Sequence, residues 1–293
     1  MAITTAMIKE LREATGAGIL DSKKALEAND GNFEKAVEFL REKGLAKAAR
    51  KASREANDGL VTAKISDDGK RASLLEVNCE TDFVARTDDF ASLVEALAQQ
   101  TFDNPDIDSV DALTAASYAG NPAQTVADAV QEAVSKLGEN IVIRRLDQYA
   151  LAGEGVIESY IHSNNRVGVL IELGTEGAVA DRAGLQELAH DLTLHVAAVN
   201  PSYISAEDVP ADLVENERRV YMAQLADDSK PENIKARIVD GRIKKFYSEV
   251  CLLEQPFVKD DKLSVQKLLQ QSGKQLGTAM TVRRFTRFEI GAN

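Results

Sequence analysis

The chain is poor in the side chains that usually build metal centres and nucleophilic sites. Among its 293 residues there are only two cysteines and three histidines. Cys79 and Cys251 lie far apart with no CxxC or metal-ligand spacing, so we expect two reduced thiols. His190 and His195 are five residues apart, which is not the i,i+4 spacing that lets two imidazoles share a metal on one helix face. The sequence therefore predicts no metal site.

Long hydrophobic runs and an excess of basic charge are also missing. No apolar stretch approaches the ~18 residues needed to span a bilayer, and Met1-Ala2-Ile3 starts no signal or transit pattern. Lys and Arg number 35 against 47 Asp and Glu, a formal net charge of -12, which opposes nonspecific nucleic-acid binding. We expect a cytoplasmic protein with no membrane contact and no direct nucleic-acid partner.

Common catalytic motifs are absent too. There is no GxxxxGKS/T phosphate loop, no GxGxxG opening a helix and no GxSxG elbow. His195 falls on an apolar stripe with Leu192 and Val199, which is typical of a core histidine. Cys79 lies inside an apolar strand pattern, which favours a packed thiol, and a thiol enzyme using Cys79 is the alternative. We expect a protein that is not an enzyme and needs no cofactor.

Residues 1–44 have the pattern of three short helices. The first covers about residues 5–15 and ends at Gly16-Ala17-Gly18. A short second helix ends at the turn 29–32, and the third runs from Phe33 to Gly44. This pattern resembles the ubiquitin-associated type of three-helix module, which binds partners through its first loop and last helix. A polypeptide-binding adaptor is therefore one alternative function.

Residues 45–57 are rich in alanine and basic side chains, with little apolar pattern. They are typical of a solvated, partly helical linker. Contact of its four basic residues with RNA is the alternative, but no aromatic side chain is interleaved with them.

Two repeated units follow the linker, at residues 58–150 and 151–293. Residues 58–61 are echoed by 154–157, and residues 141–146 by 280–285. Each unit begins with two apolar strands around a polar turn that can adopt positive φ, continues with an amphipathic helix and ends with a third strand. The sequence predicts an α+β fold in which each unit is a three-stranded antiparallel sheet covered on one face by helices.

The first unit carries a polar and aromatic cluster directly after its second strand. Thr81 is a good N-cap for a helix that begins with Asp82, where the helix dipole favours an anion. A helix start with Phe83 in the core explains every residue of this cluster. The second unit, however, has Thr175-Glu176-Gly177-Ala178 at the turn that we assign as its counterpart, with no aromatic residue. That difference favours a functional role for the cluster.

The second unit also contains a large insertion at about residues 200–277. Two charged helices are expected at about 211–225 and 232–253, with Pro231 as a first helical residue. They should form a projecting antiparallel hairpin. Its predicted seam contains Leu213, Val220, Ile234, Ile238 and Phe246. Such a hairpin either packs on the chain itself, contacts another protein or forms a homodimer.

Several motifs resemble the elongation factor Ts family. The two longest are residues 11–18 followed by 21–26, LREATGAG and DSKKAL, and residues 76–85, EVNCETDFVA. Shorter matches are GENI at 138–141, HVAA at 195–198, QPFV at 255–258 and RFE at 287–289. The chain stops at Gly291-Ala292-Asn293, so we expect it to lack the additional C-terminal helix of some family members.

The resemblance implies a guanine-nucleotide exchange factor that binds GDP-bound elongation factor Tu, displaces its magnesium ion and promotes GDP release for reloading with GTP. In that family the N-terminal module docks on the GTPase domain. The residues associated with dislodging magnesium correspond here to Thr81, Asp82, Phe83 and Val84. Further candidate contacts are Arg12, Gly16, Gly18, Ile19 and, at the hairpin tip of the second unit, His162.

Overall fold

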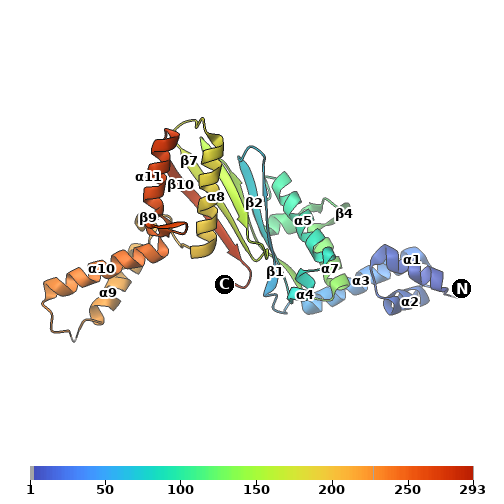
Figure 1. Cartoon of the computed structure of the whole chain (residues 1–293). Helices are drawn as coiled ribbons and strands as arrows, with labels where there is room; N and C mark the ends of the chain where they lie inside the picture. Colours follow the sequence, from blue (N-terminus) through green and yellow to red (C-terminus); the bar gives the residue numbers. More distant parts are fainter. Residues whose placement is uncertain (1–2, 227, 293) are drawn as a thin grey trace.

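A computed structural model gives the fold of residues 3–226 and 228–292 (Figure 1). Met1, Ala2, Asp227 and Asn293, with the side chains of residues 45–47 and 49, lie outside the described part, and so do the predictions made for them. The chain forms an N-terminal helical module, two sheets with helices on their outer sides, and a long helical hairpin at the opposite end from the module.

Three helices form the N-terminal module: α1 (Thr5–Thr15), α2 (Ile19–Ala28) and α3 (Phe33–Lys51). The Thr4 side chain caps α1 by accepting a hydrogen bond from the Met7 amide, and Gly16 ends the helix at φ +66°, where a side chain would be strained. Their common core contains Leu11, Ala25, Leu26 and Ala36. The expected three-helix module is confirmed.

The predicted end of the third helix at Gly44 is wrong. Helix α3 continues through Gly44 to Lys51, and Ala48 is buried in the core of the first unit. Gly44 allows close approach instead of ending the helix, because a Cβ atom there would lie 2.8 Å from Ser135 Oγ on α7 (Val126–Leu137). Residues 45–51 are thus helical, and α3 joins the module to the rest of the molecule.

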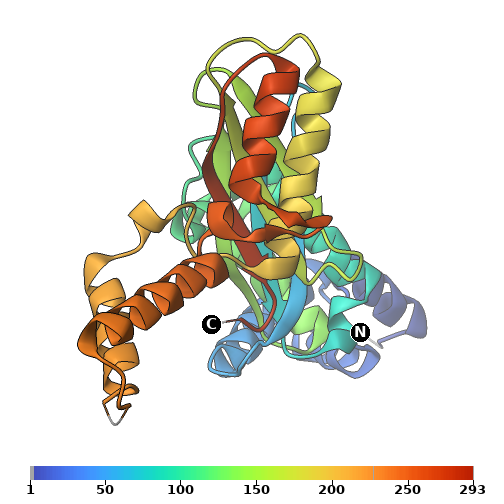
Figure 2. The same ribbon diagram turned by 60° about the vertical axis from the view of Figure 1, so that its left-hand side comes forward.

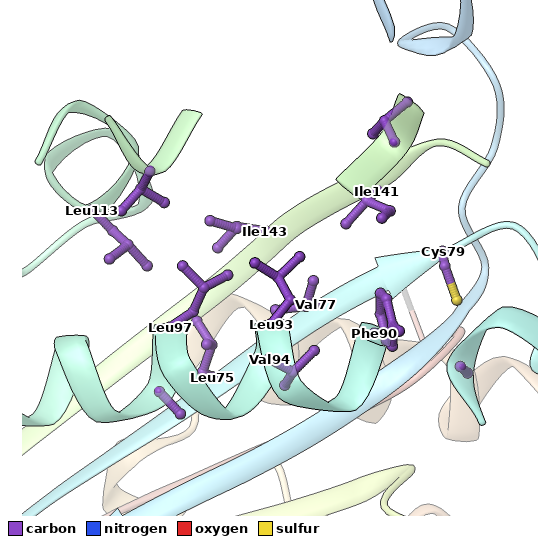
Figure 3. Packing of buried hydrophobic residues seen from close by; sticks show 14 of the residues in the cluster. Leu75, Val77, Cys79, Phe90, Leu93, Val94, Leu97, Leu113, Ile141 and Ile143 are labelled. Carbon is purple, nitrogen blue, oxygen red and sulfur yellow. The ribbon is translucent and has the colours of Figure 1, made fainter. Parts of the chain in front are cut away.

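The first unit contains a three-stranded antiparallel sheet in the order β1-β2-β5. Its elements are β1 (Asp58–Ile65), β2 (Arg71–Cys79), α4 (Asp82–Ala85), α5 (Asp88–Asp103), α6 (Val110–Ala115), β3 (Ser117–Tyr118), β4 (Asn121–Thr125), α7 (Val126–Leu137) and β5 (Ile141–Ala150). Phe90 and Leu97 on α5 pack against Leu75 and Val77 of β2 (Figure 3). The predicted hairpin, helix and closing strand are all present.

The second unit repeats this plan with a sheet in the order β10-β7-β6. Its elements are β6 (Gly155–Ile161), β7 (Val167–Thr175), α8 (Arg182–Val199), the 3-10 turn η1 (Ala206–Asp208), α9 (Ala211–Ala223), α10 (Glu232–Val250), η2 (Leu252–Glu254), β8 (Pro256–Phe257), β9 (Asp260–Ser264), α11 (Val265–Leu276) and β10 (Met280–Glu289). The small hairpin and helix β8-β9-α11 match β3-β4-α7, so the repeat includes residues that sequence alone assigned to the insertion.

The two sheets pack against each other through the faces that the helices leave uncovered. Val61, Leu74 and Tyr149 of the first sheet contact Ile157, Leu170 and Phe288 of the second. Gly168 permits this approach, because a Cβ atom there would lie 2.5 Å from Val61 Cγ1. The units therefore form one body, with helices outside and two sheets at the centre (Figure 1).

Helices α9 and α10 form the predicted hairpin, which extends away from the sheets (Figure 2). The predicted seam was largely wrong, because Ile238 alone of its five residues contacts the hairpin core. The apolar seam consists of Val214, Tyr221, Leu225, Ile238, Val239, Ile243 and Tyr247. On α9 the contact lies one residue later than predicted, and Val220 is 40% exposed. Periodicity defined an apolar stripe, but the rotation of each helix about its axis depends on packing with its partner.

Candidate functional site

A single helical turn follows β2, and we call residues 81–86 the Phe83 turn. Helix α4 is only four residues long, and the Thr81 hydroxyl caps it by accepting a hydrogen bond from the Val84 amide at 3.4 Å. Val84 and Ala85 are buried in the core of the first unit. The predicted cap and helix start are confirmed, and the two buried residues anchor the turn to the core.

Phe83 itself points away from that core. Its side chain is 80% exposed, the most exposed large apolar residue of the described chain. The interpretation of Phe83 as a core residue is therefore wrong. An aromatic ring exposed on a short, well-anchored turn has the form of an anchor for another protein, because such rings lose little side-chain entropy on burial.

The charge next to Phe83 is already paired within the turn. Asp82 forms an ion pair with Arg86, in which Oδ2 lies 2.8 Å from Nη2 of the guanidinium. The Asp82 side chain is 44% exposed and that of Arg86 is 80% exposed. An exposed pair of this kind contributes only about 0.3–0.5 kcal/mol, so it is easily exchanged for a contact with a partner. The ion pair thus orients the Asp82 carboxylate, which can still exchange Arg86 for a group of a partner.

The N-terminal module presents a second apolar contact. Ile19 and Leu20 at the start of α2 are 60% and 72% exposed. Leu20 was missed by the sequence reasoning, although a signal existed: it lies off the helical stripe of Ser22, Ala25 and Leu26 that faces the core. Arg12 is exposed at the end of α1. Gly16 and Gly18 line a cleft of about 210 Å³ between the module and α7.

His162 lies at the exposed end of β6, where its Nδ1 is 2.8 Å from the Tyr160 hydroxyl. The hairpin that carries it reaches the first unit through an ion pair between Arg166 and Asp58. Asp58 pairs in register with Cys79, the last residue of β2 before the Phe83 turn. The structure thus brings the hairpin tip of the second unit and the Phe83 turn to the same end of the first sheet.

The second unit has no equivalent of the Phe83 turn. Cys79 pairs with Ile141 and Thr175 with Met280, so the registers align Cys79 with Thr175. Their hydrogen bonds agree, since the Cys79 thiol donates to the Thr81 carbonyl and the Thr175 hydroxyl to the Gly177 carbonyl. Phe83 therefore corresponds to Val179, which is buried. The sequence alignment of the two turns was wrong by two residues, because it ignored the strand register.

The residues considered for catalysis are packed in the interior. Cys79 is fully buried, and burial, followed by the nearby charges of Glu139 and Asp58, raises the pKa of its thiol to about 12. His195 is also buried, accepts a hydrogen bond from the Val258 amide and pairs with Gln255, and burial lowers its pKa. Both predictions of core residues are confirmed. Across residues 3–226 and 228–292 no three His, Cys, Asp or Glu side chains form a metal-binding group.

Comparison with known proteins gives the family. The family model described as Elongation factor TS matches residues 80–292, and a UBA-like domain model matches residues 4–46. The chain belongs to the elongation factor Ts family. Elongation factor Ts of Clostridium novyi is 44% identical over 289 residues, which cover 99% of this chain and 93% of that protein. Elongation factor Ts of Nitratidesulfovibrio vulgaris is 44% identical over 292 residues, with 99% and 96% covered.

Membership of this family implies nucleotide exchange on elongation factor Tu, which is an action on a GTPase and not catalysis in the usual sense. The fold agrees with this family, since the ubiquitin-associated-like module and the mixed α+β units are those expected for it. None of the helices described here is long and apolar enough to cross a membrane.

Proposed function

We propose that this chain binds GDP-bound elongation factor Tu and promotes GDP release by inserting the Phe83 turn next to the nucleotide site. The observation that carries this proposal is Phe83: its ring is 80% exposed, while its neighbours Val84 and Ala85 are buried and hold the turn in place. A buried aromatic anchor at a protein interface contributes about 2 kcal/mol or more.

Displacement of magnesium is the step that this geometry supports best. Magnesium bridges the nucleotide phosphates in GTPases, so moving its ligands removes a large part of the electrostatic hold on GDP. Phe83 would maintain the distortion as a rigid side chain. Asp82 would release Arg86 and act by repelling phosphate or by taking over a partner of the metal site. Thr81 and Val84 would act indirectly, by fixing the turn.

The N-terminal module would supply affinity. Ile19 and Leu20 offer an exposed apolar contact for the GTPase domain, flanked by Arg12, Gly16 and Gly18. His162 lies at the same end of the first sheet as the Phe83 turn and is a further contact candidate. Factor and nucleotide must weaken each other's binding by the same ratio, and a hundredfold effect corresponds to roughly 2.7 kcal/mol.

We further infer that the protein acts in the cytoplasm, where elongation factor Tu works, without direct nucleic-acid contact. Homodimerisation through the α9–α10 hairpin stays a prediction. It is supported by Val220 and Met222 on α9, which are 40% and 38% exposed. Sedimentation of the full chain at increasing concentration tests it, and a constant monomer mass would rule it out.

The exchange activity is tested by release of a fluorescent GDP from elongation factor Tu in a stopped-flow instrument. We expect release to accelerate with the concentration of this protein and then to saturate. Addition of excess GDP should dissociate the complex of the two proteins. Unchanged release at saturating concentration would reject the exchange function, and retention of the complex in excess GDP would reject the reciprocal coupling.

A further inference from the structure

The Phe83 turn is held from outside its own helix by a carboxylate. Glu139, in the loop between α7 and β5, accepts the Thr81 amide at 3.0 Å through Oε2 and the Thr81 hydroxyl at 2.6 Å through Oε1. The carboxylate thus binds the backbone amide and the hydroxyl of the residue that caps α4. Charge-assisted hydrogen bonds of this bidentate kind are short and directional, so they fix the angle at which the turn leaves β2.

This arrangement gives Thr81 two roles at once. Its hydroxyl hydrogen is directed to Glu139, which leaves an oxygen lone pair for the Val84 amide at the start of the turn. Without Glu139 that hydroxyl would be free to rotate. A helix of four residues cannot hold itself together, because nucleation costs more than one turn of hydrogen bonds returns. The orientation of Phe83 therefore depends on contacts made by Thr81 and by the buried Val84.

The loop that carries Glu139 is itself fixed from several sides. The Lys51 ammonium, at the end of α3, donates to the Gly138 carbonyl. The Asn140 amide donates to Glu80 at 2.7 Å, and the Asn140 side chain donates to the Arg54 carbonyl at 2.8 Å. Residues 138–140 thus join the end of α3, the segment after it and the residues that begin the Phe83 turn. Glu139 is presented to Thr81 by a rigid loop.

The second unit supplies an internal comparison. The strand registers align residues 138–140 with 277–279, so Thr278 stands where the first unit has Glu139. Thr278 has no carboxylate, and its hydroxyl donates to the Ala279 carbonyl. The residue aligned with Thr81 is Gly177, which has no side chain to hold. The bidentate contact is therefore present in the unit with the exposed aromatic ring and absent from the other.

We propose that Glu139 is a positioning residue for nucleotide exchange: its bidentate hold on Thr81 fixes the Phe83 turn in the orientation that enters the GTPase. The residue acts through Thr81 and does not itself contact the nucleotide. This inference rests on the proposed exchange function and adds to it the part of the chain that presents Phe83.

Exchange kinetics distinguish positioning from a general contribution to folding. Release of fluorescent GDP is measured against factor concentration, which gives a maximal rate and a half-saturating concentration. For Glu139→Ala we expect the maximal rate to fall at least fivefold with a half-saturating concentration within twofold of the wild type, because Ile19 and Leu20 still dock. Glu139→Gln keeps one acceptor oxygen, so its maximal rate should lie between those of the wild type and Glu139→Ala. A purely structural role would lower the active fraction and leave the maximal rate unchanged.

Two further variants sharpen the test. The double variant Glu139→Ala with Phe83→Ala should exchange no more slowly than Phe83→Ala alone, since a misplaced ring and a missing ring remove the same contact. Asp208→Ala is the control, because Asp208 holds the Ser205 amide and hydroxyl at 2.8 Å each in the second unit. It should leave the maximal rate within twofold of the wild type. A maximal rate within twofold for Glu139→Ala would overturn the proposal, as would additive losses in the double variant.

A measurement without the partner separates this inference from the exchange function. Nitrogen-15 relaxation of the full chain gives order parameters for the amides of residues 82–86. We expect them to fall in Glu139→Ala and to keep wild-type values in Asp208→Ala. If the wild type fails to accelerate GDP release, the exchange function is wrong while this result still decides whether Glu139 fixes the turn. Unchanged order parameters in Glu139→Ala would reject the positioning role.

Discussion

The Arg284 guanidinium of the second sheet lies 3.8 Å from the ring centroid of Tyr149 in the first sheet. The reverse contact also exists, since Arg145 of the first sheet lies 4.4 Å from the ring of Phe288 in the second. Each arginine also forms an ion pair with a buried glutamate of its own sheet: Arg284 with Glu172, and Arg145 with Glu76. The two sheets are therefore joined by the same contact twice, once in each direction, and the repeat extends to the interface itself.

The pair at Glu172 predicts a loss of stability in acid. Burial raises the pKa of this carboxyl, but hydrogen bonds from the Ala152 amide, Arg284 and Arg283 outweigh it and leave the pKa below its ordinary value. A depressed pKa in the folded state contributes stability above the unfolded value of about 4.3, and this stability is lost as pH falls through the folded pKa.

Glu172→Gln should therefore lower the free energy of unfolding by about 1–3 kcal/mol at pH 7 and by less near pH 3. Urea denaturation at pH 7 and near pH 3 measures the two free energies of unfolding. Exposed Glu95→Gln is the control, and an equal loss at both values of pH would contradict the assignment.

His195 predicts a second pH effect at milder acidity. Its pKa is lowered by burial, so the folded state holds the neutral ring while the unfolded chain takes up a proton below about pH 6.5. His195 therefore contributes its whole stabilisation above about pH 6.5, and this contribution falls as pH decreases toward the pKa of the folded state. His195→Gln should reduce the difference in unfolding free energy between pH 7.5 and pH 5.5. A wild-type difference retained in His195→Gln would show that other groups cause it.

Phe83→Ala should slow maximal GDP release from elongation factor Tu tenfold or more, because the aromatic contact is lost, and it should not change the melting temperature of the free protein, because the ring is 80% exposed. Stopped-flow exchange and calorimetry measure the two effects. Ile65→Ala, at the far end of β1 and 37% exposed, is the matched control. A wild-type exchange rate in Phe83→Ala would show that the Phe83 ring has no role in GDP release. Asp82→Ala should cause a smaller loss.

The corrected seam of the helical hairpin can be tested by truncation. Ile243 is 2% exposed in the hairpin core, so Ile243→Ala should destabilise the hairpin by about 2–5 kcal/mol. Val220→Ala, at a position that is 40% exposed, should change stability by about 0.5 kcal/mol or less. Hydrogen exchange of the α10 amides measures both. Equal protection in the two variants would contradict the seam described here.

Much of the architecture followed from local patterns. The two strand pairs, the amphipathic helices after them and the closing strands were predictable, because alternation and helical periodicity are properties of neighbouring residues. The Thr81 cap was predictable for the same reason. The failures involve contacts between distant elements. Gly44 was expected to end a helix because its close approach to Ser135 is invisible in the sequence, and the hairpin seam required the relative rotation of two helices.

The candidate site divides in the same way. The motif located Phe83, but exposure of the ring and burial of Val84 depend on how the turn packs on the first unit. Glu139 lies 58 residues from Thr81, so only the folded chain brings the two together. Leu20 could have been found by comparing its position with the buried stripe of α2. Residue roles that depend on short-range periodicity were accessible, whereas those set by tertiary contacts were not.

The uninterrupted course of α3 has a geometric consequence. The helix contains 19 residues and so extends for roughly 28 Å, from the core of the N-terminal module at Phe33 to the core of the first unit at Ala48. Each residue of an α-helix also turns the chain by about 100°. Inserting one alanine before Gly44 would therefore swing Ile19 and Leu20 around the helix axis to a different side of the molecule while adding little length. An insertion of seven residues, close to two full turns, would restore their direction, so the angular phase of α3 decides which way the module faces.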